Sequence, residues 1–237
     1  MRNLPRPRNR IGLSGGLLGG TCYLCRGASQ AGVLCASCCA DLPRLPRIRC
    51  PRCALPVDSE TQCGRCLGDP PAFDATVAVF DYAFPADVLV QGLKFRGELA
   101  LAPLLAGHLA QEIGASIVDR VDFIVPVPLH AGRLAERGYN QSVEIAREVA
   151  ARLKIPLVGD LCERVRATPA QLDLPWKERR ENVRGAFSCR RALDTKRVAV
   201  VDDVMTTGAT LHEIAVTLKK FGAARVVNWV IARTTVD

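Results

Sequence analysis

The sequence predicts an α/β protein in which a mainly parallel sheet is flanked by helices and preceded by a small cysteine-rich module. Short valine-rich runs that end abruptly predict the strands, and segments with helical periodicity follow them. Eight of the eleven cysteines fall into four C-x-x-C pairs within residues 21–70, which predicts the module. With 237 residues and 49% apolar composition, the chain can hold one core of ordinary size and one smaller module.

Residues 1–20 are expected to form a flexible basic leader. Arginines precede a glycine-rich segment that loosely imitates a signal peptide, but glycine disfavours an apolar helix and no small-x-small cleavage site follows. No apolar run approaches the roughly 18 residues that are needed to span a membrane. We therefore expect a cytoplasmic protein without membrane insertion.

The second pair of C-x-x-C knuckles repeats the first with every cysteine shifted by 28 residues, so the unit is duplicated. Four thiolates from two knuckles fit a closed, tetrahedral structural Zn²⁺ site. We therefore predict a double zinc ribbon over residues 21–70 with two such sites. The predicted ligands are Cys22, Cys25, Cys35, Cys38, Cys50, Cys53, Cys63 and Cys66.

Other arrangements of these cysteines stay open. Disulfides would compete with zinc, although adjacent cysteines in C-x-x-C rarely form structural bridges. Ligands could pair between the two halves of the module, and Cys39 could replace Cys38. Cys162 and Cys189 lie far from the module in sequence and are expected to be buried small hydrophobic residues.

Positive charge is concentrated in the first 70 residues, which hold ten arginines against four acids in a chain of net charge +8. A basic module of this kind suggests contact with nucleic acid, such as single-stranded DNA, or with another polyanion. A solvated arginine-rich surface is the alternative. Tyr23 is the one aromatic residue between residues 21 and 70, which leaves little for bases to stack on.

The larger domain is predicted to cover residues 71–237, after a turn rich in glycine and proline. A strand is expected near residues 76–80, followed by a helical stretch over residues 86–114. Gly97 is predicted to interrupt that stretch. Lys94, just before the interruption, is interpreted as part of a solvated turn.

Residues 121–127 predict a second strand, which runs into a loop and then into another helix. A loop that carries arginine between a strand and a helix is suited to bind an anion. The candidate residues in this loop are Pro128, Leu129, His130, Arg133 and Arg137. His130, taken by itself, is more often a loop residue than a catalyst.

Residues 197–210, RVAVVDDVMTTGAT, carry the strongest functional signal. A valine run predicts a buried parallel strand that stops at Asp202 and Asp203, at the edge where an open α/β sheet binds its ligands. The loop after the acids is small and rich in hydroxyl and N–H groups. Its members are Met205, Thr206, Thr207, Gly208, Ala209 and Thr210.

A helix is predicted to follow this loop and to end at Gly222, with Thr210 and Glu213 able to form a capping box at its start. The N-terminus of a helix offers N–H donors and a positive dipole end, so it binds a phosphate without needing a lysine. Two carboxylates would repel a phosphate and instead suit the vicinal diol of a ribose, with Mg²⁺ nearby. The predicted ligand is a ribose 5-phosphate. A last strand is expected at residues 226–232.

An ordinary strand, turn and helix with acids at the turn is the simplest alternative. A Walker A loop is excluded because no G-x-x-x-x-G-K-[ST] occurs, and a Rossmann fingerprint because the turn lacks G-x-G-x-x-G. The stretch resembles the PRPP-binding motif of type I phosphoribosyltransferases, in which an apolar strand and two acids precede a T-T/S-G-x-T loop. The whole chain resembles the ComF family through its cysteine knuckles and the segments PVPLH, RGYNQS, RATP and NVRGAF.

This resemblance implies a type I phosphoribosyltransferase-like fold, PRPP as the ligand, Mg²⁺ with its diphosphate, and a link to DNA uptake in natural competence. Asp202 and Asp203 would be catalytic and orient the ribose, while residues 205–210 would hold the 5-phosphate. The loop over residues 128–137, together with Arg164, would take the pyrophosphate. The resemblance also implies a loop that closes over this site, with the candidates Arg164, Gln171, Arg179 and Asn182.

No side chain indicates the acceptor of a phosphoribosyl group, so two functions remain. The first is pyrophosphate-releasing transfer from PRPP to an unidentified acceptor. The second is a non-catalytic PRPP-sensing, nucleotide-sensing or DNA-handling adaptor whose zinc ribbons bind DNA or DNA-uptake proteins.

Overall fold

The structure is a computed structural model that describes residues 20–29, 32–59, 61–116, 120–167 and 181–235. The predicted leader, apart from Gly20, lies outside the described residues. The chain divides into two compact units, Met1–Ala40 and Asp41–Asp237.

The first unit holds the first half of the cysteine module. Strand β1 (Gly20–Thr21) pairs antiparallel with β2 (Ala28–Ser29), and helix α1 (Ala36–Ala40) follows. Among its described residues, only Cys22 and Leu34 are buried hydrophobic side chains. This unit needs another source of stability, because two buried apolar side chains cannot offset the loss of chain entropy on folding.

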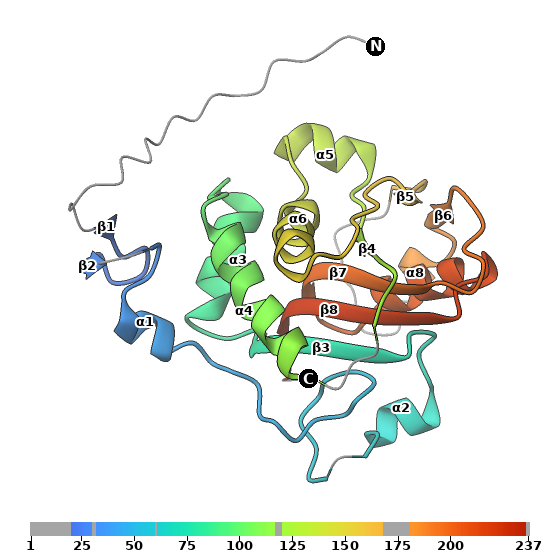
Figure 1. Cartoon of the computed structure of the whole chain (residues 1–237), viewed down its shortest axis with the longest axis horizontal. Helices are drawn as coiled ribbons and strands as arrows, with labels where there is room; N and C mark the ends of the chain where they lie inside the picture. Colours follow the sequence, from blue (N-terminus) through green and yellow to red (C-terminus); the bar gives the residue numbers. More distant parts are fainter. Residues whose placement is uncertain (1–19, 30–31, 60, 117–119, 168–180, 236–237) are drawn as a thin grey trace. The chain divides into compact units, whose positions relative to one another are not determined.

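A four-stranded, wholly parallel sheet forms the centre of the second unit, in the order β3-β8-β7-β4 (Figure 1). Its strands are β3 (Ala75–Asp81), β4 (Phe123–Pro126), β7 (Arg197–Met205) and β8 (Arg225–Arg233). The two central strands, β7 and β8, are buried along almost their whole length, which explains their continuous apolar sequences. The predicted parallel sheet is confirmed.

Strand β7 is longer than the sequence predicts. The expected end of the strand at Asp202 and Asp203 is wrong, because β7 continues to Met205. Backbone pairing with β8 also continues to Met205, which lies opposite Arg233. The two acids therefore lie within the hydrogen-bonded ladder and not beyond its end.

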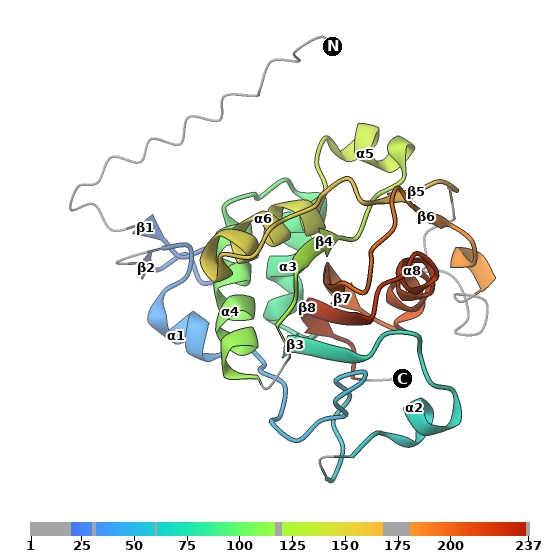
Figure 2. The ribbon, with the colours of Figure 1, turned by 45° about the vertical axis from the view of Figure 1, so that its right-hand side comes forward.

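Helices cover both faces of this sheet (Figures 1 and 2). Helices α3 (Ala86–Phe95), α4 (Leu101–Ala115) and α6 (Gln141–Leu153) lie on one face, and α8 (Ala209–Lys220) lies on the other. The predicted break at Gly97 is confirmed, since this glycine has a φ of +70° between α3 and α4. None of the helices in the described residues combines the length and the apolar character that a membrane crossing requires.

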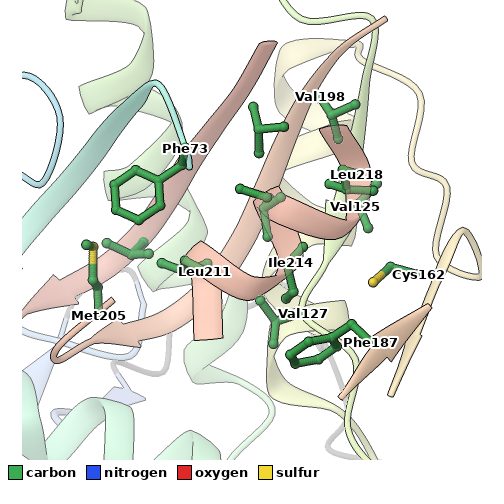
Figure 3. Close-up of a cluster of buried hydrophobic side chains, with 14 of the residues drawn as sticks. Phe73, Val125, Val127, Cys162, Phe187, Val198, Met205, Leu211, Ile214 and Leu218 are labelled. Atoms are coloured by element: carbon green, nitrogen blue, oxygen red, sulfur yellow. The ribbon is translucent and has the colours of Figure 1, made fainter. Parts of the chain in front are cut away.

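Helix α8 anchors the core on its side of the sheet. Leu211, Ile214 and Leu218 lie one helical turn apart and belong to the buried cluster that also holds Val125 and Val198 of the sheet (Figure 3). The helix begins after Gly208, which has no side chain to cap it. The predicted capping box does not form, because Thr210 lies inside the helix and the carboxylate of Glu213 instead accepts from the N–H of Gly185 at 2.7 Å.

A small antiparallel pair flanks the loop that was predicted to close over the site. Its strands are β5 (Cys162–Arg164) and β6 (Phe187–Cys189). Cys162 and Cys189 face each other across the pair and are both buried, as expected. The candidates Gln171 and Arg179 lie outside the described residues.

The second half of the cysteine module belongs to the same compact unit as the sheet. The hydroxyl of Thr76 in β3 donates to the carbonyl of Arg52 at 2.7 Å, and Arg49 donates to the carbonyl of Ala78 at 3.0 Å. Cys50, Cys53 and Cys66 belong to the buried cluster that α8 and the sheet share. The chain thus divides after Ala40 and not at residue 70, because the second half of the module shares its core with the sheet.

Replacing Ile214 by alanine tests the role of α8 as the anchor of this core. Ile214 is fully buried, so Ile214→Ala should lower the free energy of unfolding by about 2–5 kcal/mol in urea titrations followed by circular dichroism. The matched control is Ile48→Ala, at a side chain that is 46% exposed, which should change stability by about 0.5 kcal/mol or less. Equal effects of the two substitutions would contradict the packing described for α8.

Candidate functional site

The loop between β7 and α8 is shaped by one glycine. β7 ends at Met205, and α8 begins directly after Gly208, whose φ is +80°. This left-handed conformation favours glycine, and a Cβ atom at Gly208 would also lie 2.7 Å from the terminal methyl carbon of Met205, which would have to move. The hydroxyl of Thr207 accepts from the N–H of Ala209 at 3.2 Å. The turn therefore brings the N-terminus of α8 close to the end of β7.

Asp203 is held in an ion pair that the sequence did not indicate. Its Oδ2 lies 2.8 Å from the Nζ of Lys94, at the end of α3, and only 3% of the residue is exposed. Burial by itself would raise the pKa of Asp203, but the charge and hydrogen bond of Lys94 outweigh it and hold that pKa below its usual value. In turn, Asp203 raises the pKa of Lys94 against the opposing effect of burial. The interpretation of Lys94 as part of a solvated turn is wrong.

Asp202 is in a different electrostatic state. Its Oδ1 accepts from the hydroxyl of Ser142 in α6 and from the backbone N–H of Asp203, both at 2.9 Å. Burial, and then repulsion from the charge of Asp203, raise the pKa of Asp202 to about 8. Two adjacent buried carboxyl groups repel each other when both are charged, so ionisation of one disfavours ionisation of the other. Asp203 is therefore ionised and Asp202 keeps its proton near neutral pH.

The acids were expected to sit together at the open edge of the sheet, and this expectation needs correction. Asp202 is 8% exposed and Asp203 is 3% exposed, because β7 continues past them and α3 and α6 cover them. Asp202 nevertheless lines a pocket together with the loop, whereas Asp203 does not. The other residues of this pocket are Val204, Met205, Thr206, Gly208, Ala209, Thr210 and Leu211.

The loop after β4 forms a short helix, α5 (Ala131–Arg137), whose first turn His130 caps. The Nδ1 of His130 accepts from the N–H of Gly132 at 3.3 Å, which gives this histidine a structural role. Pro128 and Leu129 lead into the helix and are half-buried. The predicted loop is therefore an ordered turn that presents arginines from α5.

Arg137 is linked to the acids through a glutamine. Its Nη1 donates to the Oε1 of Gln141 at 2.5 Å, and the Nε2 of Gln141 donates to Asp203 at 3.5 Å. The guanidinium also lies over the ring of Phe95, 5.4 Å from its centroid. Arg137, predicted from the β4 loop, and Asp203, predicted from β7, thus belong to one network.

Arg164 and Arg133 approach the site from other elements. Burial, followed by the charge of Arg133, lowers the pKa of Arg164, while Asp202 acts in the opposite direction. The three groups are therefore within electrostatic reach of one another. The guanidinium of Arg164 also lies over the ring of Phe187, 5.5 Å from its centroid. Asn182, the remaining described candidate, accepts from Arg166 through its backbone carbonyl at 3.0 Å.

Several residues that shape the site were missed from sequence. Lys94, Gln141 and Ser142 all bond to the acids, yet they come from helices far from β7 in sequence. Gln141 and Ser142 lie in the RGYNQS segment, which carries part of the resemblance to the ComF family. Their position could have indicated a role in the site, because the start of α6 directly follows the candidate loop at residues 128–137.

The eight predicted cysteines form two groups of four, each drawn from one half of the module. Within each group, the sulfur atoms all lie within 4.8 Å of one another. Cys25 and Cys35 have sulfurs 3.7 Å apart, and Cys53 and Cys63 have sulfurs 3.6 Å apart. Zinc–sulfur bonds of about 2.3 Å in a tetrahedron place sulfurs roughly 3.8 Å apart, so both groups fit the metal.

The thiols of each group differ in pKa: at least one is lowered in each, whereas burial raises the pKa of Cys53 to about 11. All eleven cysteines of the chain are free, and Cys38, not Cys39, completes the first group. Hydrogen bonds from backbone N–H groups of Cys35 and Cys25 lower the pKa of Cys22 to about 6. Similar bonds overcome burial and lower the pKa of Cys50 to about 7. Each group therefore contains a thiol that readily becomes the thiolate that binds metal.

Comparison with known proteins agrees with this fold. The phosphoribosyl transferase domain family matches residues 139–234, which include both the acids and the loop. The larger unit is therefore a phosphoribosyltransferase-type domain. Among solved structures, the chain is similar to the glutamine PRPP amidotransferase of B. subtilis in complex with ADP and GMP, with a TM-score of 0.38 and 26% identity over 54% of this chain and 25% of that one.

Curated relatives extend over almost the whole chain. DNA utilization protein YhgH of Escherichia coli K12 is 36% identical over 225 residues, covering 91% of this chain and 97% of that protein. Competence protein F of Haemophilus influenzae is 33% identical over 222 residues, covering 90% and 96%. Competence protein ComFC of Streptococcus pneumoniae is 27% identical over 202 residues, covering 84% and 87%. The chain belongs to the ComF family.

The raised pKa of Asp202 predicts how stability changes with pH. Between its ordinary value of 3.8 and about 8, the folded protein keeps a proton that the unfolded chain releases. Stability from this group is therefore lost as pH rises through that window. Asp202→Asn cannot ionise, so it should become more stable relative to the wild type, by on the order of a few kcal/mol, as pH increases from 5 to 8.

Thermal unfolding of both proteins at several pH values measures this difference. Asp160→Asn, at an exposed carboxylate, serves as the control and should follow the wild type throughout. A constant difference in melting temperature between Asp202→Asn and the wild type across this range would show that Asp202 is already ionised in the folded protein.

Proposed function

We propose that this protein binds PRPP in the pocket between the end of β7 and the start of α8. The supporting observation is the turn at Gly208, which brings backbone N–H groups at a helix N-terminus beside the carboxyl group of Asp202. Hydrogen bonds to a charged group are each worth about 1.5–3 kcal/mol. Several of them, together with the helix dipole, would hold the 5-phosphate without a lysine.

The acids are assigned to the ribose. Asp202 lines the pocket and, with its proton retained near neutral pH, can both donate to and accept from a sugar hydroxyl. Asp203 lies behind it and is paired with Lys94. Lys94 thus limits the negative charge that an anionic ligand would meet. Asp203 would reach the ribose only after a local change in side-chain position.

The pyrophosphate is assigned to the arginines of the neighbouring loops. Arg133 and Arg137 on α5, and Arg164 on β5, supply positive charge next to the acids. Mg²⁺, when bound with the diphosphate, would neutralise part of its charge. If transfer occurs, the bond from the anomeric carbon to pyrophosphate breaks while the acceptor atom bonds to that carbon, through an oxocarbenium-like transition state. The arginines would stabilise the charge on the leaving group.

We also propose that both cysteine groups bind structural zinc. The first unit has few apolar contacts, so metal binding would supply most of its folding free energy. A structural zinc site contributes roughly 10–16 kcal/mol. Closed sites with four thiolates leave no position for a substrate. Unpaired thiols in these numbers suit the reducing cytoplasm.

A second function is favoured by the names of the relatives. Proteins called DNA utilization protein and competence protein match along most of the chain. The PRPP site could therefore serve as a sensor in a DNA-handling adaptor, with the basic cysteine module contacting single-stranded DNA or uptake proteins. Pyrophosphate release separates the two functions. Release that depends on an added base or amine supports transfer, whereas tight PRPP binding without turnover supports the adaptor.

Calorimetric titration of PRPP with Mg²⁺ tests the assignment of the acids. Replacing Asp202 and Asp203 together by asparagine exchanges both carboxyl groups for neutral amides, whose oxygens accept more weakly than an ionised carboxylate, and should raise the Kd for PRPP by about tenfold or more. Asp160→Asn makes the same substitution at an exposed site and should leave the Kd unchanged. An unchanged Kd in the double variant would refute the proposed ribose contact.

A further inference from the structure

Arg233, the last residue of β8, is a buried arginine to which the proposed PRPP site assigns no role. Only 2% of it is exposed. Its guanidinium donates to the backbone carbonyl of its neighbour Thr234 at 2.6 Å and to carbonyls from two distant parts of the chain. Nη1 donates to Met205 at 3.0 Å and to Thr206, and Nε donates to Cys53 at 3.0 Å.

These contacts join the loop after β7 to the second cysteine group. Met205 and Thr206 form the start of the proposed phosphate loop, and Cys53 belongs to the second cysteine group. The fork of a guanidinium can hold several carbonyls at once in a fixed geometry. A buried positive charge also requires such acceptors, because leaving it unpaired is costly. The loop and the cysteine group are therefore tied to the same side chain.

A shared pocket confirms that the two features are neighbours. Cys53 and Cys66 line it from the cysteine group, and Met205, Thr207 and Gly208 line it from the loop. A second connection lies close by, where the Nδ1 of His212 in α8 accepts from the N–H of Ala72 at 3.1 Å. The proposed phosphate loop thus lies next to the segment that carries the second cysteine group.

We propose that Arg233 is a positioning residue that couples metal binding at the second cysteine group to the conformation of the loop at residues 205–208. With metal bound, the backbone at Cys53 is fixed, Arg233 is fixed against it, and the loop carbonyls are held so that the N–H groups face the pocket. Loss of the metal releases the loop. Identification of the loop's ligand as PRPP rests on the proposed function, but the coupling does not.

The coupling can be measured by hydrogen–deuterium exchange of the backbone amides from Thr206 to Leu211 in the full chain. Removing zinc from the wild type with a chelator should accelerate exchange of these amides by about tenfold or more, the effect of losing hydrogen bonds to a charged group. Cys63→Ser, in the second group, should do the same without a chelator. Cys35→Ser, the matched change in the first group, should leave these amides unaffected.

The Arg233→Met variant tests the role of Arg233 directly. Its loop amides should exchange rapidly while its zinc content stays at the wild-type level, and a chelator should then accelerate their exchange little further. Arg190→Met, at an exposed arginine paired with Glu163, is the control and should keep both slow exchange and the response to chelator. If Arg233→Met fails to fold, Arg233→Lys keeps the charge but loses the fork, and is expected to give the same result.

Amides of β4 and β7 report whether the sheet itself stays folded. Unchanged loop exchange on zinc removal, in a protein whose sheet amides stay protected, overturns the coupling. A response to chelator that is as large in Arg233→Met as in the wild type overturns the role of Arg233. Calorimetry on the same proteins separates this inference from the proposed function: a wild type that does not bind PRPP defeats the function, while the exchange data still decide the coupling.

Discussion

Two adjacent carboxyl groups buried near the end of β7 are the constraint on which the site depends. Charges this close cannot both be ionised in a buried setting unless other groups compensate. The fold meets this requirement with Lys94 from α3, which neutralises Asp203, and with Ser142 from α6, which bonds to Asp202. Both helices lie on the same face of the sheet (Figure 2). The packing of α3 and α6 on the sheet thus also determines the charge state of the two acids.

The course of the backbone could be predicted to a large extent. Valine-rich runs predicted β7 and β8, and helical periodicity predicted α8, because these segments are buried and their patterns reflect packing directly. The end of β7 could not be predicted, since consecutive aspartates are poor strand formers. Pairing with β8 overrides that local preference, which is a tertiary effect.

The site was predictable where it is local in sequence and not where it is assembled from distant elements. The loop after β7 and the four C-x-x-C pairs follow from short spacings, because neighbours in sequence remain neighbours in space. The contacts of Lys94 and Arg233 depend on where α3 and β8 lie relative to β7. Nothing in the residues around either of them carries that information. The grouping of cysteines within each half also required the structure.

The central claim is that a sugar phosphate binds at the junction of β7 and α8. A crystal structure of the protein with PRPP and Mg²⁺ tests it most directly. The account predicts the 5-phosphate on the N–H groups that follow Met205 and the ribose hydroxyls within hydrogen-bonding distance of Asp202. A structure in which PRPP occupies another surface while this junction holds only water would contradict the account.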